Sequence, residues 1–479
     1  MQIKIHILGG FNFNIYCYDN LQLLLIYLYK WFKKGFEIME ILKSINNFIW
    51  GIPMPALLFG VHIYFTFHLK GVQKHIFKAI KLSVTPEKHG EGDISSFATL
   101  SHTLAATIGT GNIVGISTAI ALGGPGAVFW CWLTGVLGMA TSYAETFLAI
   151  LYRRKTEDGT YIGGPMYALE YGLNKKWLAV IFCFCTLIAS YGVGCSTQAR
   201  AVTETTNTLW GMPEYFVGII LAVIVGLVIL GGVKSIGSLC SKLVPTMALF
   251  YIIGCMWILI INSTYIIPTL NLIIRSAFLP SKLPAAVIGG FIGSTIRSAS
   301  RYGIARGLFT NEAGLGSAAI AAASAKTSSP QRQSLITMSA TFWDTVVMCG
   351  ITGLVIVSNL LKNPSSAGGY SFAELTTAAF KAIPYGEQIL GISLILFAIA
   401  TLIGWSYFGE KAVEYLFGKS SINTYRLCYI IMIFVGSVMS LELVWETTDL
   451  VNACMAIPNL ICLLLLRKQI LPYSNKKTF

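Results

Sequence analysis

Apolar runs of near-spanning length recur along the chain, and this pattern constrains the fold more than any other feature. A run of about 20 apolar residues can cross a bilayer as one helix. Eleven runs are present, at about residues 48–68, 98–122, 125–150, 177–200, 215–233, 243–267, 284–325, 335–361, 387–408, 424–442 and 448–466. The seventh is far too long for one span. The sequence therefore predicts an all-α integral membrane protein with about 11 transmembrane helices.

The composition agrees with a membrane location. Of 479 residues, 55% are hydrophobic and only 11% are charged, whereas about 25% are charged in an ordinary soluble domain. A soluble enzyme is therefore excluded, because only a bilayer makes a charged coat unnecessary around the middle of the molecule. All six His residues lie within the first 102 positions, without an HExxH or GxSxG motif. We expect no enzymatic activity and no cofactor.

The basic residues indicate orientation. Lys and Arg give a net charge of +13, but they lie in short loops without aromatic interleaving, so we expect no nucleic-acid partner. Alternate loops that include the C-terminal tail hold 21 of them and the opposite loops hold 4. Because cytoplasmic loops retain positive charge, the C-terminus is expected in the cytoplasm. An odd number of spans places the N-terminus on the outside, yet residues 1–47 are basic. We therefore interpret Met39 as the start and residues 1–38 as a non-native or disordered extension.

The ten runs after the first form two groups of five. Each group opens with a glycine-rich, interrupted run, and an offset of 200 residues aligns Thr110 with Thr310. The linkers also match, with paired glycines at 163–164 and 368–369. Five helices cannot return the chain to its starting side, so the two groups must have opposite orientations. The expected organisation is an extra helix at 39–75, inverted repeats at 90–267 and 268–468, and a cytoplasmic tail at 469–479.

The interrupted runs predict a binding site near the middle of the membrane. A broken helix frees N–H groups at one half-helix start and carbonyls at the other half-helix end, and lipid cannot satisfy either. The N–H groups suit a carboxylate, and the carbonyls suit an ammonium group or Na⁺. A small neutral amino acid together with Na⁺ satisfies both. The alternative is that the glycines only permit close helix packing.

Within this scheme, the N–H groups of Thr110 and Gly111 would hold the substrate carboxylate, and Gly109 and Gly111 would allow its close approach. The amine would meet carbonyls of Thr107 and of residues 309 and 310. Gln198 offers a neutral amide, although a bond to another helix is an alternative role. The expected substrate-binding residues are Thr107, Gly109, Thr110, Gly111, Asn112, Gln198, Phe309, Thr310, Glu312 and Trp405.

Trp405 ends the ninth run. It could close over a small substrate side chain, or it could belong to the aromatic belt at the membrane surface. For Na⁺, which prefers oxygen ligands, we expect a site with four neutral contributors. Thr401 would give its hydroxyl and three residues their carbonyls, namely Ala105, Ile108 and Ala398.

Three acidic residues fall inside the runs, where carboxylates are costly and usually functional. Glu312 lies beside the second break and could bind the amine or the ion. For Glu145 and Asp344 we favour structural ion pairs with basic residues of the seventh run. The candidates for that pairing are Arg297, Arg301 and Arg306.

Several strings resemble the alanine or glycine:cation symporter family, the sodium:alanine amino acid carriers. They are NNFIWG (46–51), GTGNIVG (109–115), ALGGPGAVFW (121–130), GGPMY (163–167), ARGLFTNEAGLGS (305–317) and GWSYFGEK (404–411). The resemblance implies sodium-driven transport of L-alanine, glycine or D-alanine on the five-plus-five inverted-repeat fold of the leucine-transporter type. One departure is Arg200, two residues after Gln198, which puts the substrate preference in doubt.

We therefore expect a multi-pass protein of the bacterial inner membrane that acts as a monomer, with an amino acid, Na⁺ and the lipid bilayer as its partners. Two alternatives remain open. The same fold could be driven by protons, with Glu312 or Asp344 as the carrier. A channel or receptor for small amino acids is the second alternative.

Overall fold

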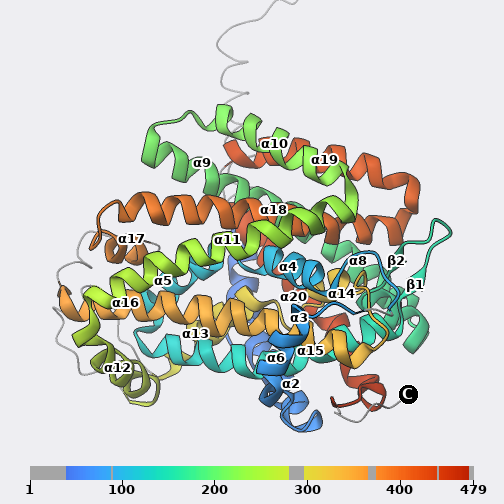
Figure 1. The fold of residues 1–479 in the computed structure, drawn as a ribbon, viewed down its shortest axis with the longest axis horizontal. Coiled ribbons are helices and arrows are strands. Elements are labelled where there is room, and N and C mark those ends of the chain that lie inside the picture. The colour runs from blue at the N-terminus through green and yellow to red at the C-terminus, as the bar shows by residue number, and fades with distance from the viewer. Residues whose placement is uncertain (1–38, 88–89, 280–295, 365–373, 440–441, 474–479) are drawn as a thin grey trace, which may run out of the picture.

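The computed structural model describes residues 39–87, 90–279, 296–364, 374–439 and 442–473. Within these ranges the chain is mostly helical, and its two strands, β1 (Arg154–Lys155) and β2 (Tyr161–Ile162), form one short antiparallel hairpin (Figure 1). The expected extension at 1–38 and the paired glycines at 368–369 lie outside the described residues.

A helix at 39–49 leads, after a turn, into α2 (Pro53–His68). The helices of the first half are α2 (Pro53–His68), α3 (Ile76–Ser83), α4 (Ser96–Thr107), α5 (Val114–Gly123), α6 (Gly126–Leu151), α7 (Pro165–Tyr167), α8 (Lys176–Tyr191), α9 (Thr197–Trp210), α10 (Glu214–Leu230) and α11 (Gly232–Ile261). Short 3-10 turns are η1 (Val72–His75) and η2 (Thr110–Asn112), and π-helical segments are η3 (Ala168–Gly172) and η4 (Gly192–Ser196).

The second half of the chain is also mostly helical. Its helices are α12 (Ile266–Phe278), α13 (Ile296–Asn311), α14 (Ser317–Ala322), α15 (Pro330–Thr341), α16 (Gly350–Lys362), α17 (Leu375–Phe380), α18 (Gly386–Phe417), α19 (Ile422–Val438) and α20 (Glu442–Leu465). A π-helical segment, η6 (Phe342–Cys349), joins α15 to α16, and 3-10 turns are η5 (Ser263–Tyr265), η8 (Lys419–Ser421) and η9 (Arg467–Gln469).

Eight helices of the described residues are long and apolar enough to cross a membrane, and the bent pair of α4 with residues 110–123 would make a ninth. The helix α10 is apolar but shorter. Most of the predicted runs are therefore helices, and the run at 284–325 is, in its described part, two helices separated by a break.

Two helices extend well beyond their predicted apolar runs. The helix α11 begins at Gly232 rather than near 243, and α18 continues to Phe417 rather than ending near 408. In the extra turns of α18, charged side chains pair along the helix. In α18, Lys411 Nζ lies 2.7 Å from Glu414 Oε2. A hydropathy boundary therefore marks the end of the apolar surface and not the end of the helix.

The two broken helices lie in the interior of the bundle. The helix α13 packs along α6 and also against α5, while α18 packs against α4, α8, α9 and α11. In Figure 1, α10 and α19 run side by side at one edge, and α13 and α6 cross the opposite half. This arrangement encloses both breaks and leaves α19 largely exposed, with 28% of its spanning window buried against 72% for residues 330–362.

Candidate functional site

The first break separates α4 from α5 and bends the pair by 63°. The helix α4 ends at Thr107, and Ile108 and Gly109 are extended. The N–H of Gly109 donates to Asn112 Oδ1 at 2.9 Å. Among the described residues, no acceptor takes the N–H of Thr110 or Gly111. Two adjacent donors are thus available for an anionic group.

Asn112 is held on its other side by Asp344. The Asn112 side-chain amide donates to Asp344 Oδ1 at 2.7 Å and to the Asp344 carbonyl at 3.1 Å. The Thr345 hydroxyl donates to Asp344 Oδ2 at 2.7 Å. The expected ion pair of Asp344 with an arginine is therefore wrong in this structure. Asp344, in a π-helical segment, orients the residue that closes the first break.

The second break lies between α13 and α14. Glu312, Gly314 and Gly316 all adopt positive φ angles, 54°, 94° and 84°, which turn the chain sharply and are strained for a non-glycine residue. Glu145 Oε1 accepts hydrogen bonds from the N–H of Gly314 at 2.9 Å, from the N–H of Gly316 at 3.0 Å and from Asn459 Nδ2 at 2.7 Å.

This network corrects the prediction for Glu145. The expected ion pair with an arginine is wrong, because among the described residues the partners of this carboxylate are backbone N–H groups and an amide. A carboxylate is well suited to this position, since the start of α14 exposes N–H groups that lipid cannot satisfy. Glu145, on α6, thus supplies the hydrogen-bond acceptor that the break itself lacks.

Trp405 is fully buried, with no exposed surface. Its Nε1 donates to Glu312 Oε1 at 3.1 Å, and the Ser317 hydroxyl donates to Glu312 Oε2. The alternative that Trp405 belongs to an aromatic belt at the membrane surface is therefore wrong. Its indole packs directly on Gly194, which leaves no room for a Cβ there.

The two breaks meet. A Cβ built on Gly111 would lie 2.8 Å from Thr310 Cγ2 and 3.7 Å from the Phe309 ring. Thr110 and Thr310 are both buried, and Phe309 and Thr310 belong to the last turn of α13. The structure thus joins predicted residues that are 200 positions apart in sequence, and only glycine at 111 permits this approach.

Gln198 lies beside the same place. It follows the π-helical segment η4, and its Nε2 donates to the Val193 carbonyl at 3.1 Å. Its Oε1 is buried and has no partner among the described residues, and a Cβ on Gly109 would lie 3.8 Å from it. A bond to another helix is therefore not what holds Gln198, since its partners lie in its own helix.

Arg200 turns away from Gln198. Its Nε lies 2.8 Å from Glu204, its Nη1 pairs with Glu214, and Nη1 also donates to the Ser437 carbonyl. The sequence departure at this position therefore places no unpaired guanidinium beside Gln198.

The expected sodium ligands lie on two adjoining helices. The Thr401 hydroxyl on α18 lies 3.4 Å from the Ile108 carbonyl at the end of α4, and it donates to the Phe397 carbonyl at 3.0 Å. Ala105 and Ala398 are fully buried on the same helices. The contact between Thr401 and Ile108 unites two of the four predicted ligands, and their neutral oxygens suit Na⁺.

A cavity of about 470 Å³ opens from the first break. Thr110, Gly111 and Phe309 line it together with residues of α5. Charged residues that the sequence analysis did not place in the site also line it, namely Glu204, Glu446 and Asp449, together with Arg306. A signal for Glu446 and Asp449 was available, because both stand at the start of the last apolar run.

Arg153 links the two broken helices at their ends away from the breaks. The Arg153 guanidinium donates to the carbonyls of Glu91 at 2.9 Å, Ala325 at 2.8 Å and Thr327 at 3.1 Å. These acceptors lie before α4 and after α14, so one side chain joins the outer ends of both broken helices. Nearby, burial raises the pKa of the Asp93 carboxyl, and a hydrogen bond from the Tyr161 N–H opposes the rise.

The fold and the paired breaks define a helical membrane transporter. MhsT in complex with L-phenylalanine, a solved structure, superposes with a TM-score of 0.57 at 15% identity over 78% of this chain and 89% of that chain. This likeness confirms the predicted fold class, a five-plus-five inverted repeat of the leucine-transporter type. The sequence profile of the Sodium:alanine symporter family matches residues 36–476, and the chain belongs to this family.

Curated relatives cover the chain almost completely. The sodium/alanine symporter AgcS of Methanococcus maripaludis is 46% identical over 438 residues, 90% of this chain and 95% of that protein. The probable sodium/glutamine symporter GlnT of Bacillus subtilis is 36% identical over 441 residues, 90% of this chain and 89% of that protein. The chain is therefore a multi-pass, sodium-coupled amino acid symporter, and its substrate is a separate question.

Proposed function

We propose that this protein imports a small neutral amino acid, alanine, glycine or D-alanine, together with Na⁺. The observation that supports this proposal most strongly is the pair of N–H groups at Thr110 and Gly111, which face no acceptor among the described residues and adjoin a cavity. Backbone donors at a half-helix start bind a carboxylate without an added positive charge.

The rest of the substrate would be held by neutral groups. The carbonyls of Thr107, Phe309 and Thr310 would accept from the ammonium group. Gln198 brings a buried amide with an unpaired oxygen; either end of that amide can serve, because it contains both a donor and an acceptor. Trp405, packed on Gly194 and bonded to Glu312, would limit the size of the substrate side chain.

The buried carboxylates already accept hydrogen bonds within the protein, and this favours Na⁺ over protons as the coupling ion. Glu312 accepts from Trp405 and Ser317, and Asp344 accepts from Asn112 and Thr345. Each therefore serves as an acceptor inside the protein, whereas the Thr401 hydroxyl and the Ile108 carbonyl form a neutral oxygen pair that suits Na⁺.

The orientation follows from the charge distribution. With the C-terminus in the cytoplasm of a bacterial inner membrane, we propose that the hydrogen bonds of Arg153 lie on the cytoplasmic side and that the cavity opens outward. Na⁺ and amino acid would bind in this state, and rocking of the helices would then open the cytoplasmic side. We propose a monomer with the repeats at 90–267 and 268–468.

Uptake of radiolabelled L-alanine into proteoliposomes tests the function. An inward Na⁺ gradient at equal pH should concentrate alanine inside the vesicles, and a pH gradient without Na⁺ should not. Unlabelled glycine and D-alanine should compete, whereas glutamine should compete poorly. Uptake driven by pH alone would favour proton coupling, and uptake that only equilibrates alanine would indicate a channel.

A further inference from the structure

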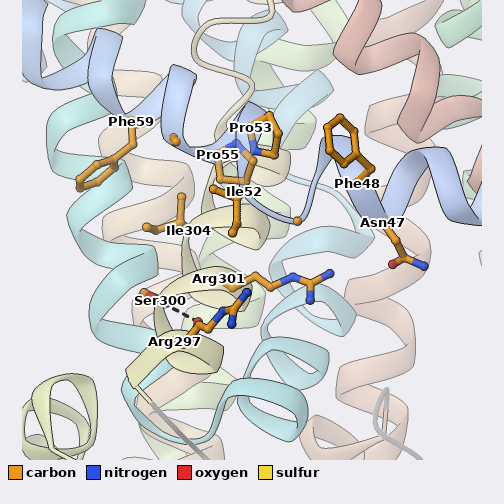
Figure 2. A pocket seen from close by; sticks show the side chains of 12 residues that line it. Asn47, Phe48, Ile52, Pro53, Pro55, Phe59, Arg297, Ser300, Arg301 and Ile304 are labelled. Carbon is orange, nitrogen blue, oxygen red and sulfur yellow. Dashed lines mark hydrogen bonds between the residues drawn. The ribbon is translucent and has the colours of Figure 1, made fainter.

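A groove of about 510 Å³ lies between α13 on one side and, on the other, the end of the helix at 39–49 with the beginning of α2 (Figure 2). Its walls are mainly apolar, from the turn and first part of α2 on one side and from Ile304 on the other. Phe48 and Ile52 at its rim are 73% and 59% exposed. In a membrane protein such a rim faces lipid, so the groove is accessible from the bilayer.

Two arginines interrupt this apolar surface. Arg297 and Arg301 line the groove one helical turn apart on α13, and both side chains extend along it (Figure 2). Among the described residues, no carboxylate lies within 4.0 Å of either guanidinium. Like charges at this spacing repel, and a guanidinium beside lipid is costly without a counter-charge. The pair therefore calls for an anion.

The order of residues along α13 indicates the shape of that anion. Arg297 and Arg301 supply the charged part of the groove. Ser300 and Ile304 continue the same face of α13 into the apolar part of the groove. A ligand with a charged head and an apolar tail matches this gradient, whereas a free anion would match only its charged part.

We propose that this groove binds one anionic phospholipid of the surrounding bilayer. Arg297 and Arg301 hold the phosphate, since guanidinium groups bind phosphate oxygens through paired hydrogen bonds. One acyl chain lies against Phe59 and Ile304. Because α13 leads into the second break, the lipid holds a helix that must move during transport.

The test uses the full-length protein purified in detergent and native mass spectrometry with added phosphatidylglycerol or phosphatidylcholine. The wild type should retain one phosphatidylglycerol molecule in preference to phosphatidylcholine, by roughly tenfold or more for two basic contacts. The double variant Arg297→Gln with Arg301→Gln should lose this preference. A matched control, Arg275→Gln with Lys381→Gln, removes two charges from exposed sites on the same predicted side and should keep it.

A second variant tests the apolar part. Ala56 is exposed and lines the groove, so Ala56→Trp should fill it and reduce lipid retention while both arginines stay. Thermal melting of every variant, with sodium-dependent uptake as a second check, shows whether it is folded. Equal retention of the two lipids by the wild type, or unchanged preference in the double variant, would overturn the proposal.

Competition with inorganic phosphate distinguishes a bound lipid from a free anion at the arginines. At millimolar concentration it should not displace the bound phosphatidylglycerol, because it cannot occupy the apolar part of the groove. Full displacement by phosphate, or full retention of the lipid by Ala56→Trp, would show an anion site at the arginines and would refute a lipid in the groove.

Discussion

The two helix breaks occupy matching positions in the repeats but are satisfied in different ways. At the first, the Thr110 and Gly111 N–H groups have no acceptor among the described residues, and the only side chain that closes the turn is the neutral Asn112. At the second, two carboxylates are committed, with Glu145 on the backbone of the break and Glu312 joined to Trp405.

This difference assigns different tasks to the two repeats. A break whose donors already have a carboxylate partner is held by the protein. A break whose donors face a cavity can accept a carboxylate from outside. The inverted repeat thus supplies two similar interruptions. The acidic residue on α6 occupies the second, and we propose that the first is left for the substrate.

The largest expected effect comes from removing the clamp on the second break. Glu145→Ala leaves three buried donors without an acceptor, each costing about 1–3 kcal/mol. We expect a thermal midpoint lowered by several degrees or more and loss of uptake. Thermal melting of the purified protein measures this, with Glu157→Ala, an exposed carboxylate in the turn between β1 and β2, as the control. A normal midpoint for Glu145→Ala would show that the second break does not need a carboxylate.

Gln198→Ala should act at the first break without unfolding the protein. We expect alanine affinity to fall by roughly tenfold, the equivalent of one hydrogen bond to a charged group, about 1.5 kcal/mol. Competition of unlabelled against radiolabelled alanine on the purified protein measures it. Gln73→Ala, which removes a glutamine on η1 far from both breaks in the sequence, should leave affinity unchanged. The same affinity in Gln198→Ala and the wild type would exclude this residue from the substrate site.

Thr401→Ala separates the ion from the amino acid. Removing one neutral oxygen beside Ile108 should raise the Na⁺ concentration for half-maximal uptake by roughly five- to tenfold, about 1 kcal/mol, with little change in the maximal rate at saturating Na⁺. Thr401→Ser keeps the hydroxyl and should behave like the wild type. A Na⁺ dependence identical in Thr401→Ala and Thr401→Ser would contradict the ion site.

The smallest effect is expected for Trp405→Phe. It keeps a ring against Gly194, removes the hydrogen bond to Glu312 and replaces the indole by a smaller ring, so we expect a loss of a few fold in uptake, about 1 kcal/mol. Larger amino acids such as glutamine should become better competitors than they are for the wild type. An unchanged competition profile would show that Trp405 does not limit substrate size.

Features encoded by local sequence were predictable from the residues. The density of glycine around 109–111 and 314–316 predicted both breaks, because helices tolerate it poorly. The three-residue spacing of Ala398 and Thr401 places both on one face of a single helix, and both lie on α18.

Features that depend on tertiary contacts were not predictable. Glu145 bonds to residues 169 and 171 positions away, and nothing local distinguishes that contact from a salt bridge. The expectation of arginine partners failed because Arg297 and Arg301 line the groove beside α2 and Arg306 lines the cavity. The charge of a buried carboxylate indicates that it needs partners. Which groups those partners are depends on how α6, α13 and α20 pack together.

The central claim is that the first break binds the substrate carboxylate, and equilibrium binding of radiolabelled alanine to Gly111→Ala tests it most directly. A Cβ there would lie 2.8 Å from Thr310 Cγ2, so the variant should bind alanine at least roughly tenfold more weakly at saturating Na⁺, in keeping with about 1–3 kcal/mol for overpacking. Gly60→Ala, whose Cβ would meet nothing within 4 Å, should bind like the wild type. Wild-type affinity in a folded Gly111→Ala protein would contradict the account.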